Sequence, residues 1–146
     1  MDLSDAEKKI KSRIQEGSVF YFSDDRFTKD IPHYYVVLNK NPLKDIILIL
    51  IFATTFDTNR FMQIENSPYP QNTYITLTSK ECSILKKPSL FDCNFVLETN
   101  VGEIISKFSS GQLKISGEID VAILDKLRLG VFKSPAVAEK VKKLLK

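Results

Sequence analysis

The sequence predicts an α+β fold, in which a small, strongly bent antiparallel β-barrel is flanked by an N-terminal helix and C-terminal helices. Five short segments have the composition of β-strands, and a tight connection joins two of them between residues 33 and 54. Helix signals fall at the start and the end of the chain instead of alternating with the strands. The 146 residues suit a single domain over 1–146, with the barrel core over about 17–98 and a helical part over about 100–146.

A short helix is predicted at the N-terminus. Ser4 and Glu7 have the spacing of a capping box. Ile10 and Ile14 then fall on one helical face before Gly17 ends the helix.

Three strands are predicted next. Residues 18–22 are β-branched and aromatic, residues 23–32 form a polar loop, and residues 33–39 read as the second strand. The third strand, 46–54, contains the eight-residue run Ile46–Ala53, in which apolar residues do not alternate with polar ones. Both of its faces should therefore be covered, which places it in the middle of the sheet.

A long excursion separates this strand from the next one. Residues 56–72 are of mixed polarity and contain two prolines, so we expect irregular structure there. A fourth strand is predicted over 73–77, and Thr78 and Glu81 form a second capping box at the start of a short helix. A fifth strand is predicted over 91–97.

The remaining residues are predicted to be helical. Asn100 caps a helix that Gly111 ends, and the apolar periodicity of 118–130 predicts another. Ser134 and Pro135 have the residue types of the cap and first position of a final helix.

Composition excludes several classes of protein. With 43% hydrophobic and 27% charged residues and a net charge of +3, the chain is an ordinary globular protein. The longest apolar run has eight residues, against roughly 20 for a membrane span, and the N-terminus lacks a signal peptide. Cys82 and Cys93 are expected to be reduced thiols. We therefore expect a cytoplasmic protein without a membrane association.

Lysines concentrate at the C-terminus. Residues 133–146 carry five lysines and one acidic residue. Lysines near a helix C-terminus favour the helix dipole, and a phosphate-binding role is the alternative. The final helix offers no Arg, Asn or Gln to read base edges, which disfavours a separate DNA-binding helix-turn-helix.

Several kinds of catalytic site are also excluded. The five glycines do not cluster, so neither a P-loop nor a dinucleotide fingerprint is present. One histidine without a nucleophile elbow makes a hydrolase triad improbable. One histidine and two cysteines do not complete a zinc site. No metal and no cofactor is expected.

The order of the segments resembles the MazF/PemK family of toxin ribonucleases. The similar segments are "EGSVFYF", "HYYVVLN", "DIILILIFATT", a proline-containing loop, "TYITLTSKECSILKKPSLFDCNFVLE" and a closing helix, spanning about residues 16–130. The resemblance implies an SH3-like barrel, commonly a homodimer, that cleaves single-stranded RNA and is neutralised by an antitoxin protein.

Some site residues follow from the resemblance. Thr54 and Thr55 match the threonine at the end of the family's third strand, where a hydroxyl can contact the scissile phosphate. His33 stands where the family usually has an arginine that stabilises phosphate charge.

The sequence also departs from the family. Glu16 replaces the starting arginine, and Asp92 stands in place of another arginine. Cys93 and Asn94 fall nearest to a Cys-Asp pair of the family.

Cleavage of RNA through its 2′-hydroxyl needs a base, an acid and a cation for the phosphorane charge. His33 can be the acid or the base, Arg60 can supply the charge, and Asp92 is a second candidate base. Each residue also has an interpretation without a catalytic role. His33 can be a histidine at a strand start that is paired to backbone or water. The threonines can reflect β-propensity, and Arg60 can be a solvated loop residue.

Candidate RNA-binding residues lie around the hairpin and the excursion. Tyr34, Phe56 and Tyr69 can stack on unpaired bases, and Asn94 is a further candidate. The alternative is that the aromatic residues belong to the core.

Two functions follow from these observations. The first is a divergent MazF/PemK-like toxin, a metal-independent endoribonuclease for single-stranded RNA. The second is a catalytically silent SH3-like barrel that binds a protein or RNA. The replacement of charged residues of the family in this sequence favours this second function.

Overall fold

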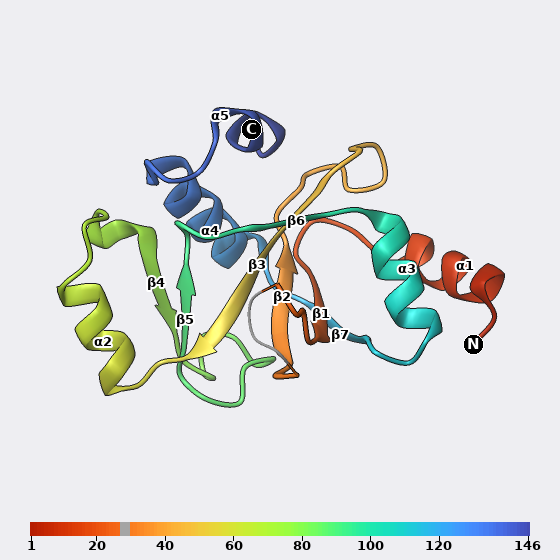
Figure 1. Cartoon of the computed structure of the whole chain (residues 1–146), viewed down its shortest axis with the longest axis horizontal. Helices are drawn as coiled ribbons and strands as arrows, with labels where there is room; N and C mark the ends of the chain where they lie inside the picture. Colours follow the sequence, from red (N-terminus) through yellow and green to blue (C-terminus); the bar gives the residue numbers. More distant parts are fainter. Residues whose placement is uncertain (27–29) are drawn as a thin grey trace.

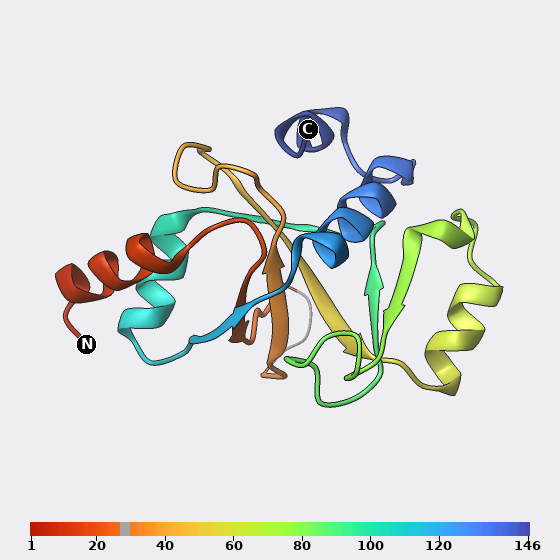
Figure 2. The same cartoon turned by 180° about the vertical axis from the view of Figure 1, so that it is seen from behind.

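A sheet of seven antiparallel strands forms the centre of the protein, and helices pack against both of its faces (Figures 1 and 2). The computed structural model describes residues 1–26 and 30–146. In chain order the elements are α1 (Leu3–Arg13), β1 (Ser18–Phe22), β2 (His33–Val37), β3 (Leu48–Thr55), α2 (Thr58–Glu65), the 3₁₀ turn Gln71–Thr73, β4 (Tyr74–Leu77), β5 (Ser89–Asp92), β6 (Leu97–Thr99), α3 (Val101–Ser109), β7 (Lys114–Glu118), α4 (Val121–Lys133) and α5 (Glu139–Leu144).

Strand β3 is the central strand, as its unbroken apolar run predicts. It pairs with β2 along one edge, and along the other edge with β6 near its start and β5 near its end. Leu48, Ile49, Leu50 and Ile51 have no exposed surface. Covering both faces of this strand removes a large apolar area from water, which is the main favourable contribution to folding.

The strand order is β4-β5-β3-β2-β1-β7, with β6 beside β3. The α+β class, the antiparallel pairing and the flanking helices are confirmed. Among the described residues, β4 and β7 lie at the two ends of an open sheet. Closure into an SH3-like barrel therefore stays a prediction.

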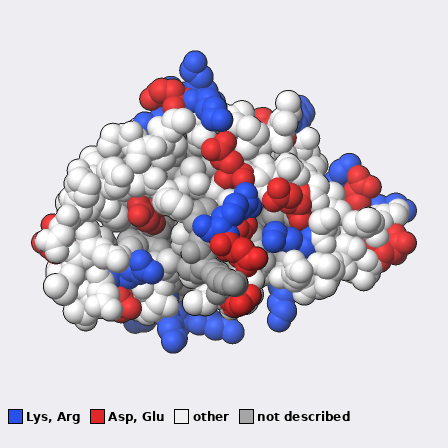
Figure 3. Space-filling model, in the orientation of Figure 1, with Lys and Arg blue, Asp and Glu red and all other residues white. Residues whose placement is uncertain are grey.

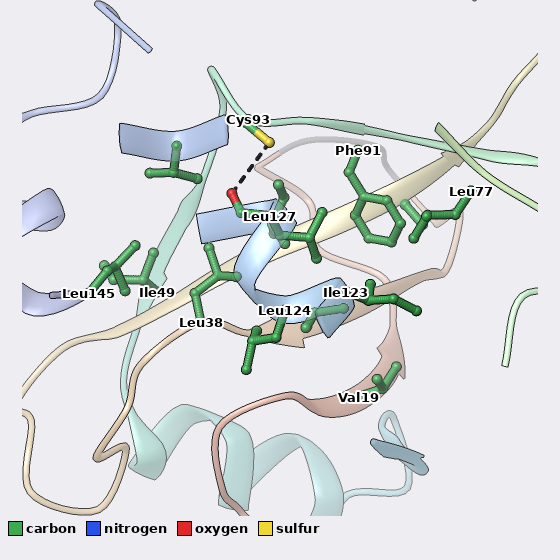
Figure 4. Close-up of a cluster of buried hydrophobic side chains, with 14 of the residues drawn as sticks. Val19, Leu38, Ile49, Leu77, Phe91, Cys93, Ile123, Leu124, Leu127 and Leu145 are labelled. Atoms are coloured by element: carbon green, nitrogen blue, oxygen red, sulfur yellow. Dashed lines mark hydrogen bonds between the residues drawn. The ribbon is translucent and has the colours of Figure 1, made fainter. Parts of the chain in front are cut away.

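The pleat gives the sheet two different faces. On one face, which we call the α1/α3 face, Leu48 and Leu50 join a core that α1 and α3 cover. On the other, the α4 face, Ile49 and Ile51 pack with α4 residues such as Leu127 (Figure 4). Because alternate residues of a strand point to opposite faces, Thr54 and Thr55 belong to different faces.

Residues 56–72 are not an irregular excursion, so that expectation is wrong. Helix α2 occupies 58–65. The Asp57 carboxylate caps this helix by accepting a hydrogen bond from the Arg60 N–H at 2.9 Å. The two prolines follow the helix and therefore do not interrupt it.

The fifth predicted strand, 91–97, is two short strands joined by a turn. The Asp92 carboxylate accepts a hydrogen bond from the Asn94 N–H at 2.9 Å, which ends β5 in a side-chain turn. The C-terminal part is also not entirely helical, because β7 pairs with β1 as an edge strand. That pairing joins segments far apart in the chain, and local propensity does not report it.

The predicted caps are only partly correct. Asp2, not Ser4, caps α1, since its carboxylate accepts hydrogen bonds from the backbone of Ser4 and Asp5. Thr78 and Glu81 form their expected reciprocal hydrogen bonds, but the segment makes turns instead of a helix.

The C-terminal helices also differ from the prediction. Ser134 is the C-cap of α4 rather than the start of a final helix, and α5 begins at Glu139. The Ser134 hydroxyl is buried and donates to the Asn94 side-chain carbonyl at 2.6 Å. The same hydroxyl accepts a hydrogen bond from the Ala136 N–H at 3.1 Å, so Ser134 caps a bend that precedes α5 instead of the first turn of a helix.

Helix α4 approaches the turn after β5 very closely at Gly130. A Cβ atom at Gly130 would lie 2.5 Å from the Cys93 sulfur, which itself has no exposed surface. Figure 4 shows Cys93 beside α4, where its thiol donates to the Leu127 carbonyl oxygen at 3.6 Å.

We expect Gly130→Ala to destabilise the protein by about 1 kcal/mol, because an overpacking cost of about 1–3 kcal/mol exceeds the gain of about 1 kcal/mol in helix propensity. Adding Cys93→Ala should restore part of this loss by vacating the contact. Urea unfolding of both variants measures the effect. A Gly130→Ala variant more stable than the unmodified protein would contradict the close approach.

Candidate functional site

The C-terminal end of β3 reaches a groove on the α1/α3 face. Exposure rises along the strand from Ala53, which is buried, to Thr55, which is exposed. Thr54 lies between them and pairs with Leu90 of β5. Its hydroxyl donates to the Leu90 carbonyl oxygen at 3.3 Å, which fixes the side chain against the sheet.

We call this hollow the α2 groove; its volume is about 720 Å³. Its walls are the sheet, helix α2 and the segment that follows α2. The lining residues are Arg26, Phe52, Thr54, Arg60, Gln63, Ile64, Asn66, Ser67, Pro68, Tyr69, Tyr74, Leu90, Asp92 and Phe95. Figure 3 has the same orientation as Figure 1. It shows few charged atoms over α2 and the neighbouring strands. Four of the residues singled out from the sequence, Thr54, Arg60, Tyr69 and Asp92, thus line one cavity.

Arg60 is the cation of this groove that no described carboxylate neutralises. It lies in the first turn of α2, and its Nη1 donates to Gln63 Oε1 at 3.0 Å. Among residues 1–26 and 30–146, no acidic group lies within ion-pair distance of it. Such a guanidinium can receive the charge of a phosphate.

Arg26 is a second groove-lining arginine that sequence reasoning missed. Its guanidinium binds Asp24 with two hydrogen bonds, from Nε at 2.9 Å and from Nη2 at 2.7 Å. A further hydrogen bond reaches the Glu98 carbonyl oxygen at 3.3 Å. Hydrogen bonding to Arg26 lowers the pKa of Asp24, so the pair stays ionised at neutral pH. Arg26 thus shapes the wall, but its charge is offset.

Asp92 is held in place by its neighbour Asn94. Its Oδ1 accepts hydrogen bonds from the Asn94 backbone at 2.9 Å and from the Asn94 amide group at 3.0 Å. The same amide group donates to Thr73 Oγ1 at 2.8 Å, and the Asn94 carbonyl accepts from Ser134. Asn94 is buried and does not line the groove, so the structure places it as a residue that orients Asp92.

His33 lies at the start of β2, on the other side of the β3 end. Its Nδ1 is 3.0 Å from the Ala53 carbonyl oxygen. Because a carbonyl only accepts, Nδ1 carries the proton, and Nε2 is the basic nitrogen of the neutral ring. The His33 ring is 5.4 Å from the ring of Phe52, which lines the α2 groove.

The surroundings of His33 favour its neutral form. Burial lowers its pKa, and the positive charge of Arg60 lowers it further, while the hydrogen bond to Ala53 opposes both. A charged Arg60 therefore disfavours a charged His33.

His33 itself lines a second cavity of about 450 Å³, which we call the lysine pocket. The lining residues are Tyr21, Ile31, Pro32, His33, Tyr34, Ala53, Thr54, Thr55, Leu85, Lys86, Lys87, Ser89, Lys114 and Ser116. Thr54 belongs to both cavities. The predicted residues are therefore divided between two cavities that meet at the end of β3.

The other candidates are placed as follows. Tyr34 and Thr55 line the lysine pocket, and Tyr69 lines the α2 groove. Phe56 is half-buried and, like Asn94, lines neither cavity.

Neither cysteine is suited to catalysis. Both are free and buried. Burial raises the pKa of the Cys93 thiol to about 12, so it is protonated at neutral pH. Over the described ranges 1–26 and 30–146, no group of three potential metal ligands comes together. In the same ranges, none of the helices has the length and apolar character that a membrane span requires.

The single histidine of the chain makes its titration easy to follow. We expect its NMR midpoint to lie below about 6.5, the value of an unperturbed histidine, and Arg60→Ala to move the midpoint upward by removing a like charge. Since the folded chain then binds fewer protons than the unfolded chain, this group lowers stability as the pH falls through that range. A midpoint above the unperturbed value, or one that Arg60→Ala lowers, would contradict the arrangement.

Comparison with known proteins supports the fold. No family model and no curated protein matches the sequence. A solved structure described as an endoribonuclease in complex with its cognate antitoxin, from a mycobacterial species, is similar to 81% of this chain and 90% of its own, with a TM-score of 0.51 and 9% sequence identity. At this identity the likeness establishes a shared fold. This shared fold agrees with the MazF/PemK resemblance of the sequence.

Proposed function

We propose that the chain is an endoribonuclease of the toxin–antitoxin type that cleaves single-stranded RNA where the α2 groove and the lysine pocket meet. The observation that carries the proposal is the position of Thr54. Thr54 lines both cavities, with His33 in one and Arg60 and Asp92 in the other. The fold shared with an endoribonuclease supports the same reaction class.

The chemistry assigned to these groups is attack by the ribose 2′-oxygen on the adjacent phosphorus. His33 Nε2, on a ring whose pKa is lowered, takes the 2′-hydroxyl proton. Arg60 stabilises the negative charge of the phosphorane, and the Thr54 hydroxyl, turned away from the Leu90 carbonyl oxygen, donates its proton to a phosphate oxygen. The bond from phosphorus to the 5′-oxygen breaks, and water protonates that oxygen. The products are a 2′,3′-cyclic phosphate and a 5′-hydroxyl, and no metal enters any step.

Asp92 has a supporting role in this proposal. Its carboxylate lines the groove with one oxygen engaged by Asn94, so the other can accept a hydrogen bond from a ribose or a base. It is also the second candidate base. The tyrosine rings at 34 and 69 supply stacking surfaces, one in each cavity.

The proposal includes the partners implied by the sequence resemblance. These are an antitoxin protein that neutralises the toxin and a second copy of the chain in a homodimer, in the cytoplasm. The described solved structure contains an antitoxin, which supports the first of these.

One observation favours a second function, a catalytically silent module that binds RNA or protein. Of the two arginines that line the α2 groove, Arg26 is already paired with Asp24, which leaves Arg60 to meet substrate charge. A site with one uncompensated cation is sparse for phosphoryl chemistry.

The test is incubation of the purified protein with single-stranded RNA and a metal chelator between pH 6 and 8. We expect products with 2′,3′-cyclic phosphate ends. His33→Ala should lower the rate by about 10²–10⁴-fold, the usual contribution of a general base, and Arg60→Ala by about 10²-fold or more. Mass spectrometry of the ends and gel assays of the rate measure both.

Arg13→Ala is the matched control for Arg60→Ala, because Arg13 is an exposed arginine on α1. It should leave the rate unchanged, and circular dichroism should show all variants folded. Equal rates for His33→Ala and the unmodified protein would contradict the proposed base. Intact RNA that nevertheless binds the protein would establish the silent module instead.

A further inference from the structure

The lysine pocket is a cationic cavity, and none of its described lining residues is acidic. Lys86, Lys87 and Lys114 line it together with His33. All three lysines are exposed, and no ion pair of theirs is found in residues 1–26 and 30–146. The carboxylates of the described chain are thus placed elsewhere, and three positive charges face the same space.

The lysines come from separate segments that the fold brings together. Lys86 and Lys87 lie in the connection between β4 and β5, which runs below the ends of the strands in Figures 1 and 2. Lys114 opens β7, at the far edge of the sheet. Figure 3 shows basic atoms gathered along this lower margin of the molecule. Lys114 is far from Lys86 and Lys87 in the sequence. The fold of the chain therefore brings the three lysines together.

Aromatic rings and hydroxyls complete the pocket. Strand register places Lys114 opposite Tyr21, and Tyr21 opposite Tyr34. The two tyrosine rings are packed with their centroids 4.7 Å apart. Thr55 and Ser89 are also opposite each other in register, and both line the pocket. Ammonium groups and hydroxyls bind phosphate oxygens, and tyrosine rings offer surfaces for unpaired bases.

The pocket is continuous with the α2 groove at one residue. Thr54 lines both cavities at the end of β3. The α2 groove also includes Phe52, which packs with the α1/α3 core, whereas the lysine pocket includes Ala53 of the α4 core, so the two cavities lie toward opposite faces of the sheet. A flexible single strand can pass over this end, while a rigid duplex cannot follow the change of face. The continuity therefore favours a flexible strand over a duplex as the occupant, and the tyrosine rings beside the lysines favour a nucleic acid over an acidic peptide.

We propose that the lysine pocket is a substrate subsite that binds the sugar-phosphate backbone of single-stranded RNA beside the nucleotide held in the α2 groove. Lys86, Lys87 and Lys114 contact phosphates, and Tyr21 and Tyr34 present a face to a base. The inference rests on the proposed function for the identity of the ligand, and binding can be measured without cleavage.

The test uses the full chain, a fluorescent 2′-O-methyl oligoribonucleotide and anisotropy titrations at several salt concentrations. The methylated RNA has no 2′-hydroxyl to attack phosphorus, so binding alone is observed. We expect the variant Lys86→Ala/Lys87→Ala/Lys114→Ala to bind at least about tenfold more weakly. The slope of the logarithm of the binding constant against the logarithm of the salt concentration should fall in magnitude by about 2. Each lost phosphate contact to a single strand contributes about 0.7, and three contacts are removed.

The matched control is Lys8→Ala/Lys9→Ala/Lys126→Ala, which removes three exposed lysines from α1 and α4. It should change the affinity and the slope little. Equal losses in the two triple variants would mean that net charge alone acts, and would overturn the subsite. An unchanged RNA affinity in the pocket variant, with lost binding to a polyglutamate peptide, would assign the pocket to an acidic protein and also overturn it.

The two proposals can fail separately. If the unmodified protein leaves natural RNA intact but binds methylated RNA through the three lysines, the subsite stands and the nuclease function fails. If RNA is cleaved but the pocket variant binds and cleaves like the unmodified protein, the subsite fails and the nuclease function stands.

Discussion

Burial of β3 on both faces is the constraint on which the rest of the structure depends. Its apolar residues alternate between the core under α1 and α3 and the core under α4, and its backbone pairs with β2, β5 and β6. A strand held on all sides has little freedom to shift register, since a one-residue slip would turn each core side chain to the wrong face. The position of its last residues is therefore fixed by packing far from the site.

That rigidity gives the polar residues at the strand end their arrangement. Thr54 faces the α2 groove while Thr55 faces away, and the His33 ring is hydrogen-bonded to the carbonyl oxygen of Ala53, the residue before them. Behind the groove, Asn94 connects Asp92 to the 3₁₀ turn and to the end of α4 through buried hydrogen bonds. Buried polar networks of this kind hold side chains in one orientation, because breaking any member leaves an unpaired group. The candidate site is thus supported from the core outward.

The sequence predicted the features that depend on local pattern and missed those that depend on long-range contacts. The unbroken run in β3 predicted a central strand, and His33 and Thr54, singled out from the sequence, lie together at the end of β3 where the two cavities meet. Helix α2 has a good cap in Asp57, but the two prolines that follow it are typical of irregular structure and obscure so short a helix in the sequence. Strand β7 was missed because its stability comes from pairing with β1. Arg26 carried no local signal, since it reaches the groove only through its two hydrogen bonds to Asp24 and the fold of the sheet.

The most direct test of the central claim is NMR mapping of the backbone amides during titration with uncleavable single-stranded RNA. The claim is that the end of β3 is where a bound strand crosses between the two cavities. We expect the largest shifts in residues 54–60 and 86–90 and at Lys114, with the middle of β3 unchanged. Shifts confined to the lysine-rich residues 133–146, or the absence of saturable shifts near Thr54, would contradict it.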